Sequence, residues 1–152
     1  MVGTVREIYI AEKGTTPVFL QSADVEAGKG IFGDRYYKNK GTFSEKLAGN
    51  PKGDITFIAS EEVDQFNLSQ NESLGYGELR RNIVTQGVRL KELIGKEFSI
   101  GSARFLGIEH CEPCAHLAST VNQKVLPHLI HTGLRAAIIL SGKLEVGDEI
   151  SS

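Results

Sequence analysis

Apolar and polar residues alternate over several short stretches of the chain, and a period of two is typical of β-strands. The clearest example is Asp54–Ala59, in which Ile55, Phe57 and Ala59 fall on one face. Shorter or less regular apolar stretches predict further strands at Met1–Ala11, Asn82–Thr85, Glu97–Ile100, Ala103–Ile108, Leu134–Leu140 and Lys143–Ile150, and the stretch Pro17–Glu26 contains the β-prone Val18-Phe19-Leu20. The pattern therefore predicts a chain built mainly from short strands.

Two pairs of neighbouring strands are predicted to form hairpins, because only two residues separate the strands of each pair. Gly101-Ser102 would form the first turn, and Ser141-Gly142 would form the second. Helix signals are fewer. Ser60 is suited to cap a short helix that ends near Phe66, and apolar periodicity predicts another helix over Val121–Ile130. Many short strands with few helices favour a β-barrel or sandwich with peripheral helices.

The composition is that of an ordinary globular protein. The chain has 152 residues, of which 40% are hydrophobic and 24% charged, with a net charge of −2. No apolar stretch approaches the roughly 18 residues that a transmembrane helix needs. Arg6 and Glu7 lie where a secretory signal would be apolar. We therefore expect one domain over residues 1–152, a cytoplasmic location, and no binding of nucleic acid or membranes.

Both cysteines and two of the four histidines lie within the seven residues His110–His116. Thiolates attack electrophiles and ligate metals, so this segment is the place for sulfur or soft-metal chemistry. Cys114 follows Pro113, which suits the first turn of a helix, and a helix N-terminus stabilises a thiolate. The spacing alone leaves other uses open. These are burial of small side chains in the core, a thiol–disulfide pair, and a zinc site formed by His110, Cys111, Cys114 and His116.

A long stretch without periodicity, Gly28–Gly53, is rich in glycine, lysine and asparagine. Loops of this length inside a compact domain are usually functional. Arg35 and Ser44 lie in it beside glycines, and such a flexible backbone with an arginine, hydroxyls and amides is suited to binding an anion. The alternative is a surface loop in which Asp34 and Arg35 balance each other's charge.

A second polar stretch, Gly77–Val84, enters a predicted strand. Alternation along that strand would place Arg80, and not Arg81, on the same face as Asn82. A guanidinium beside an amide suits a phosphate or an oxo-anion. Arg135, at the start of another predicted strand, is a third candidate cation. A charged strand edge that discourages further pairing is the alternative explanation.

The order of these motifs resembles the MOSC family, named for the C-terminal domain of molybdenum-cofactor sulfurase. The resemblance extends from about Val2 to Ile150. It rests on Gly33-Asp34-Arg35, Gly77–Val84, Leu93–Gly101, Cys111-Glu112-Pro113-Cys114, Gly133–Ala136 and Val146-Gly147-Asp148. It implies a closed β-barrel of the kind first seen in pyruvate kinase, with a few short peripheral helices.

The resemblance also implies a cofactor, because MOSC domains bind the molybdenum cofactor or handle its sulfur. Cys114 would be the molybdenum ligand and the catalytic residue, and a soft thiolate suits that metal. Arg80 and Asn82 would correspond to an Arg-x-Asn motif that binds the cofactor. With the anion-binding candidates Arg35, Ser44 and Arg135, these residues make up the expected site.

Two roles follow from this resemblance. The chain would be a carrier of the cofactor or its sulfur, or the molybdenum subunit of a reductase of N-hydroxylated compounds. A separate redox or sulfur-donor protein would be its partner, because the chain has no ferredoxin-like cysteine cluster. Pyridoxal phosphate is not expected, because no lysine stands in a recognisable Schiff-base motif. The alternative function is a non-catalytic zinc-binding or thiol-redox module that uses the Cys-x-x-Cys segment.

Overall fold

The computed structural model of the chain describes residues 2–11, 17–34, 54–79, 81–110 and 133–152. The helices predicted from Pro113 and over Val121–Ile130 lie outside these residues. In chain order the elements are β1 (Val2–Ile10), β2 (Val18–Leu20), β3 (Ser22–Glu26), β4 (Gly30–Ile31), β5 (Ile55–Ala59), α2 (Ser60–Gln70), the 3-10 helix η2 (Tyr76–Leu79), β6 (Ile83–Gln86), the 3-10 helix η3 (Leu90–Leu93), β7 (Glu97–Ile100), β8 (Ala103–His110), β9 (Gly133–Leu140), β10 (Gly142–Glu145) and β11 (Glu149–Ser151).

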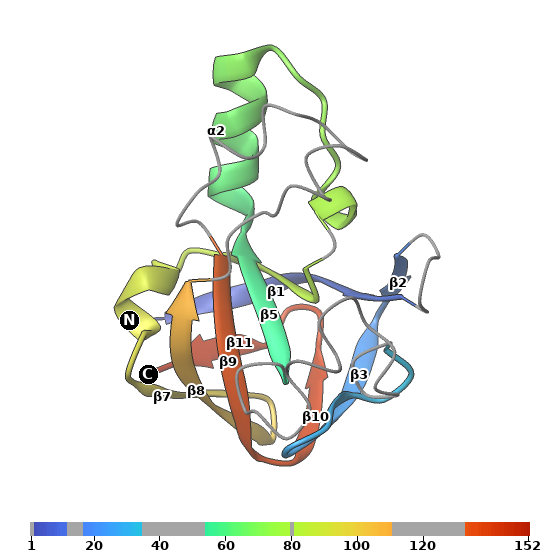
Figure 1. Cartoon of the computed structure of the whole chain (residues 1–152), viewed down its shortest axis with the longest axis vertical. Coiled ribbons are helices and arrows are strands. Elements are labelled where there is room, and N and C mark those ends of the chain that lie inside the picture. The colour runs from blue at the N-terminus through green and yellow to red at the C-terminus, as the bar shows by residue number, and fades with distance from the viewer. Residues whose placement is uncertain (1, 12–16, 35–53, 80, 111–132) are drawn as a thin grey trace.

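Seven strands close into a barrel in the order β1, β11, β7, β8, β9, β5 and β6, and β6 pairs with β1 again (Figure 1). Neighbouring strands are antiparallel except β5 and β6, which are parallel. A parallel pair needs a crossover connection, and α2 lies in that connection, projecting from one end of the barrel. The prediction of a mainly β, closed barrel is confirmed.

Aromatic and aliphatic side chains fill the barrel. The rings of Phe57, Phe98 and Phe105 are fully buried, and their centroids lie 5.4–5.8 Å apart. Ile55 and Ala59 belong to the same core, so the face predicted from the alternation of β5 is confirmed. Replacing a buried phenylalanine in such a core with alanine typically lowers the free energy of unfolding by about 3–5 kcal/mol.

A second, smaller apolar cluster joins α2 to the outside of the barrel. Ile58 of β5 and Val84 of β6 point away from the main core and pack with Val63, Phe66 and Leu74. The helix was predicted to end near Phe66 but continues to Gln70. Among the helices that the structure describes, none is long and apolar enough to cross a membrane.

The cap predicted for this helix is wrong. Ser60 is the first helical residue, and Ala59 occupies the N-cap position without a side-chain hydrogen bond. The strand runs directly into the helix, so packing of β5 fixes the start of α2 and no capping hydroxyl precedes it. Glu61 and Glu62 do lie in the first turn, as predicted, where carboxylates are favoured by the helix dipole.

The first predicted hairpin is confirmed, because β7 and β8 pair up to Ile100 and Ala103 on either side of the two-residue turn. The second is wrong. β9 pairs with β8 and β5, whereas β10 leaves the barrel and pairs with β3. Ser141-Gly142 has the composition of a hairpin turn, but it directs the chain into a separate three-stranded sheet of β10, β3 and β4.

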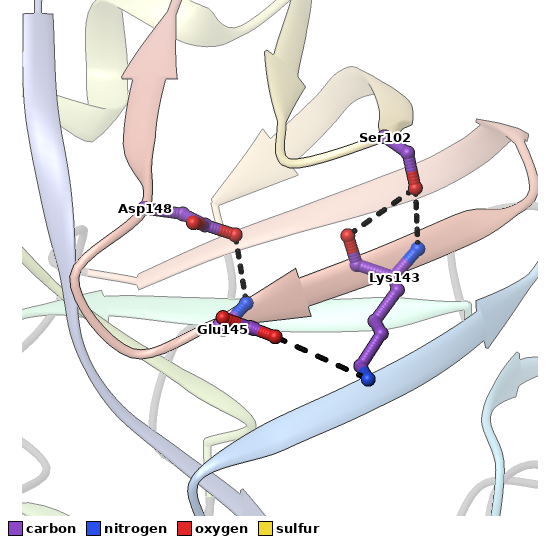
Figure 2. Close-up of polar contacts among 4 residues, drawn as sticks. All are labelled: Ser102, Lys143, Glu145 and Asp148. Carbon is purple, nitrogen blue, oxygen red and sulfur yellow. Dashed lines mark hydrogen bonds and ion pairs between the residues drawn. The ribbon is translucent and has the colours of Figure 1, made fainter.

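Contacts with the β7–β8 turn hold β10 in this position (Figure 2). The hydroxyl of Ser102 accepts the Lys143 N–H at 2.8 Å and donates to the Lys143 carbonyl at 3.4 Å. Asp148 Oδ2 accepts the Glu145 N–H at 2.8 Å and so shapes the turn before β11. Gly101 has φ +58°, and a Cβ there would collide with the Lys143 carbonyl, so the close crossing requires glycine.

Asp54, just before β5, is a buried carboxylate that ties two distant segments together. Its Oδ2 accepts the Ile138 N–H of β9 at 2.9 Å and the Gly28 N–H at 3.3 Å. Burial raises the pKa of Asp54, and this effect outweighs the two backbone N–H groups, which lower it.

We expect Asp54→Asn to change how stability depends on pH. A carboxyl whose pKa is raised in the folded state contributes stability below its ordinary pKa of 3.8 and loses that contribution as pH rises through the folded-state value. The free energy of unfolding of the wild type, minus that of Asp54→Asn, should therefore fall as pH rises from 3.8 and then level off. Urea denaturation at a series of pH values measures this difference. Asp24→Asn is the control, because Asp24 is exposed. A flat difference would contradict the prediction.

Candidate functional site

Two of the sequence motifs meet at a small pocket beside the carboxyl end of β1. Asp34 comes from the Gly33-Asp34-Arg35 motif, and Arg81 and Asn82 come from the Gly77–Val84 motif. The remaining lining residues are Tyr9, Ile10, Ala11 and Pro17. The empty space is about 160 Å³ and includes open solvent. We call it the β1-end pocket. Because that space includes open solvent, the enclosed part holds little more than a water molecule, and most of any ligand would lie outside it.

The backbone before β6 explains why Arg81 and Asn82 line the same pocket. The strand begins only at Ile83 and follows the short helix η2. Asn82 lies in a bend, so the alternation of a strand does not apply to it. The prediction that Arg81 faces away from Asn82 is therefore wrong, because it assumed that the strand began earlier.

Asn82 joins three strands through its side chain and backbone. Its Oδ1 accepts the N–H and the hydroxyl of Thr56 on β5, at 3.2 and 3.1 Å. Its own N–H donates to Thr56 Oγ1 at 3.1 Å, and Nδ2 donates to the Tyr9 carbonyl on β1 at 3.2 Å. The Tyr9 N–H donates to the Asn82 carbonyl at 2.7 Å. Asn82 is 7% exposed, so these bonds lie in a buried junction.

Thr56 connects Asn82 to Arg135, the other predicted site residue that the structure describes. Thr56 lies directly opposite Arg135 of β9, and Arg135 lies opposite Glu109 of β8. Directly opposed residues of paired strands project from the same face. Ile55 and Phe57 point into the barrel, so Thr56 and Arg135 lie on its outer face. We call Glu109, Arg135, Thr56 and Asn82 the outer polar row.

The outer polar row begins near the carboxyl end of β8. Glu109 is the penultimate residue of β8, which ends at His110. Cys114 follows His110 by four residues in the sequence. The row thus runs from the end of β8, shortly before the Cys-x-x-Cys segment in the sequence, to the β1-end pocket.

Tyr9 forms one wall of the pocket. Its hydroxyl donates to Glu7 Oε1 at 2.6 Å, and burial together with this carboxylate raises the pKa of Tyr9 to about 12. The phenol therefore stays protonated near neutral pH. Its ring packs edge-on against Phe19, with centroids 5.9 Å apart. A Cβ at Gly77 would lie 2.7 Å from the Tyr9 ring, so glycine is needed where η2 approaches β1.

Asp34 places a second charge in the pocket wall. It is 3% exposed, and its Oδ1 accepts the Ala11 N–H at 3.0 Å. This bond fixes the carboxylate at the point where β1 has ended. A ligand group in the pocket would therefore meet both the Arg81 guanidinium and the Asp34 carboxylate, so a lone anion gains only part of the attraction of the arginine.

The structure brings Asn82 and Arg135 into one outer row. The other predicted site residues, Arg35, Ser44, Arg80 and Cys114, lie outside the described residues. Arg35 and Arg80 each adjoin a pocket residue in the sequence, namely Asp34 and Arg81. Of the four proposed zinc ligands only His110 is described. The described segments contain no group of three or more His, Cys, Asp and Glu side chains that could bind a metal.

Sequence reasoning missed Thr56, Tyr9 and the pocket-facing position of Arg81. A signal for Thr56 was present, because it is the one polar residue within Ile55–Ala59. A polar residue inside a strand that is buried on both faces needs a hydrogen-bond partner. Tyr9 carried no comparable signal, since a tyrosine at that position also fits an ordinary half-buried strand.

The fold and the site define a small closed β-barrel domain with a polar row on its outside. A family model for the MOSC domain matches residues 44–151. The chain therefore belongs to the MOSC domain family.

Solved structures share this fold at low sequence identity. The YuaD protein from Bacillus subtilis matches with a TM-score of 0.82 and 19% identity, over 99% of this chain and 94% of that one. YiiM from Geobacillus stearothermophilus matches with a TM-score of 0.72 and 13% identity, over 98% of this chain and 74% of that one. For YiiM from Escherichia coli the values are 0.67, 17%, 99% and 69%. A comparison with curated proteins found no match.

Proposed function

We propose that this MOSC domain binds the molybdenum cofactor along the outer polar row and the β1-end pocket, with Cys114 as the sulfur ligand of the metal. The observation that carries the proposal is the meeting of the Gly33-Asp34-Arg35 and Gly77–Val84 motifs at one pocket. Nothing in either local sequence requires this meeting. It is the expected result if both motifs serve one ligand.

The donors along this surface fit the chemistry of that cofactor. Arg81 and Arg135 carry permanent positive charge, and Asn82 offers an amide N–H beside them. Guanidinium groups bind phosphate and metal-oxo oxygens through paired, charge-assisted hydrogen bonds. Asp34 is an acceptor for the N–H groups of a heterocycle. The cofactor, when bound, supplies a redox-active metal centre that also accepts sulfur.

Each protein group has a separate task in this proposal. Arg81 and Arg135 bind and orient anionic groups, Asn82 fixes the chain that presents Arg81, and Cys114 supplies a soft thiolate. The domain would act as a carrier of the cofactor or its sulfur, or as the molybdenum subunit of a reductase of N-hydroxylated compounds. In either role an electron or sulfur donor would be a separate protein.

Elemental and pterin analysis of freshly isolated protein tests the proposal. Protein from cells supplied with molybdate should contain molybdenum and pterin in equal amounts, and protein from cells grown without molybdate should lack the metal. Stoichiometric zinc without molybdenum would instead support the zinc-binding alternative. A reversible two-electron titration of Cys111 and Cys114, with neither metal bound, would support a thiol-redox protein.

Reductase and carrier roles are separated by two further measurements on the loaded protein. A reductase subunit should convert an N-hydroxylated compound when an artificial electron donor is supplied. A carrier should instead transfer its cofactor to an acceptor protein that lacks it, without turnover. Transfer without reduction would establish the carrier role.

A further inference from the structure

The side of the β1-end pocket that β2 adjoins is apolar and exposed. Pro17 lines the pocket, and the next two residues, Val18 and Phe19, are 57% and 46% exposed. We infer that this side binds a planar aromatic ring of the ligand, and that Phe19 is the residue that contacts the ring. The identity of the ligand rests on the proposed function, because both the pterin of the cofactor and an aryl N-hydroxylated substrate contain such a ring.

The pairing of β1 with β2 decides where the Phe19 ring lies. Phe19 lies directly opposite Tyr9, and opposed residues of paired strands project from the same face. Ile8 belongs to the barrel core, so Tyr9 and Phe19 project from the outer face. Tyr9 lines the pocket, and its ring packs edge-on against Phe19 with centroids 5.9 Å apart. The Phe19 ring therefore lies directly beside one wall of the pocket.

Tyr9 holds the Phe19 ring in a defined position. The Tyr9 hydroxyl donates to Glu7 Oε1 at 2.6 Å, and the backbone of Gly77 lies close against the Tyr9 ring. An aromatic side chain that packs against an anchored neighbour loses little freedom when a ligand covers it. Less conformational entropy therefore opposes binding at Phe19 than at an isolated surface ring.

The small size of the pocket places most of a ligand on the surface around it. A ligand that puts one polar atom into the enclosed part must lay its remaining atoms outside. On the β2 side that surface offers Pro17 and the Phe19 ring. An aromatic ring that covers Phe19 gains from the burial of apolar area on both partners and from the contact between the rings.

The test uses benzohydroxamate and free pterin as aromatic probes, each titrated into the isotope-labelled full chain and followed by NMR. We expect saturable binding of at least one probe by the wild type, with the largest amide shifts at Val18–Leu20 and Tyr9. Phe19→Ala should bind that probe at least roughly fivefold more weakly, as is typical of a lost stacking contact. Phe19→Leu should recover part of this loss, because it retains apolar contact without the ring.

Two controls isolate the contribution of the rings. Cyclohexanecarbohydroxamate carries the same polar group as benzohydroxamate on a ring of similar size that is not planar, so it should bind the wild type more weakly. Leu140→Ala is the matched protein control, because Leu140 is a strand residue of β9 that is 52% exposed and does not line the pocket. It should leave each affinity within about twofold of the wild type.

Several results would overturn the inference. These are equal affinities of Phe19→Ala and the wild type, equal losses in Phe19→Ala and Leu140→Ala, tighter binding of the cyclohexane compound than of benzohydroxamate, or no saturable binding of either aromatic probe. Dimerisation that Phe19→Ala abolishes, without binding of a probe, would assign this surface to a second copy of the chain. Melting temperatures confirm that each variant is folded.

The pterin content of the purified variants identifies the source of the ring. Tighter binding of free pterin, with a lower pterin content in Phe19→Ala, would assign the ring to the cofactor. Tighter binding of benzohydroxamate, with an unchanged pterin content, would assign it to a substrate. Both results support the inference.

The same measurements separate this inference from the proposed function. If the wild type contains neither molybdenum nor pterin but its affinity for an aromatic probe depends on Phe19, the aromatic site stands and the proposed cofactor is wrong. If the wild type contains both and Phe19→Ala retains the pterin and the affinity for each probe, the cofactor stands and the role of Phe19 is wrong.

Discussion

Cys114→Ser should abolish retention of molybdenum, whereas Cys111→Ser should retain most of it. Only Cys114 follows Pro113, and the sequence predicts a helix N-terminus there that stabilises a thiolate. Serine stays protonated near neutral pH and is a poor ligand for a soft metal site. The measurement is the ratio of molybdenum to protein after purification from cells supplied with molybdate.

The two single variants control each other, because each removes one sulfur from the same four-residue segment. A zinc site or a disulfide pair needs both sulfurs and would be lost equally in either variant. Circular dichroism of each variant shows whether the fold is intact. Equal loss of molybdenum in two folded variants would contradict the assignment of Cys114 as the sole sulfur ligand.

Asn82→Ala should lower the free energy of unfolding by about 2–4 kcal/mol, because it leaves several buried groups without partners. The Thr56 N–H and hydroxyl would lose their acceptor, and the Tyr9 carbonyl would lose a donor. At about 2–4 °C per kcal/mol for a chain of this size, the melting temperature should fall by roughly 5–15 °C. Urea and thermal denaturation measure both quantities.

Thr85→Val provides the matched control for Asn82→Ala. Thr85 is also buried in the β6 region, but its hydroxyl makes a single long bond of 3.4 Å to the Ile58 carbonyl. Replacing Thr85 with valine should lower the free energy of unfolding by about 1 kcal/mol or less. In a double-mutant cycle, Asn82→Ala and Thr56→Val should be non-additive by about 0.5–3 kcal/mol, because both remove the hydrogen bond between the Thr56 hydroxyl and Asn82 Oδ1. Additive effects, or equal costs for Asn82→Ala and Thr85→Val, would contradict the proposed junction.

Retention of cofactor by Asn82→Ala links this stability effect to the site. If Asn82 acts by positioning Arg81, both Asn82→Ala and Arg81→Ala should lower the molybdenum and pterin content of the purified protein, but only Asn82→Ala should lower the melting temperature by several degrees. The two variants would then separate positioning from recognition. The opposite pattern would assign the recognition role to Asn82.

The sequence by itself determined the local elements of this protein. Alternation within Ile55–Ala59 specified which side chains enter the core, because the side chains of any strand point to opposite faces in turn. The Gly101-Ser102 turn specified the β7–β8 hairpin, because two adjacent strands and a short turn form without help from distant residues. The sequence also identified Asn82 and Arg135 as candidate site residues, because an amide and a guanidinium can donate hydrogen bonds to an anion.

Tertiary structure decided which distant segments came together. β11 closes the barrel by pairing with both β1 and β7, and the Ser141-Gly142 turn leads to β3 instead of back to β9. Both outcomes depend on non-local pairing, for which neighbouring residues carry no signal. The same holds for the meeting of Asp34 with Arg81, which the sequence places 47 residues apart.

The position of Arg81 shows most directly where prediction from alternation along the sequence fails. Alternation predicts a side chain's face only where the backbone is extended, and the structure begins β6 one residue after Asn82. Thr56 and Tyr9 hold that bend through bonds to Asn82. The sequence thus determined which polar residue types were available near the β1-end pocket, and the packing of three strands decided which of them line it.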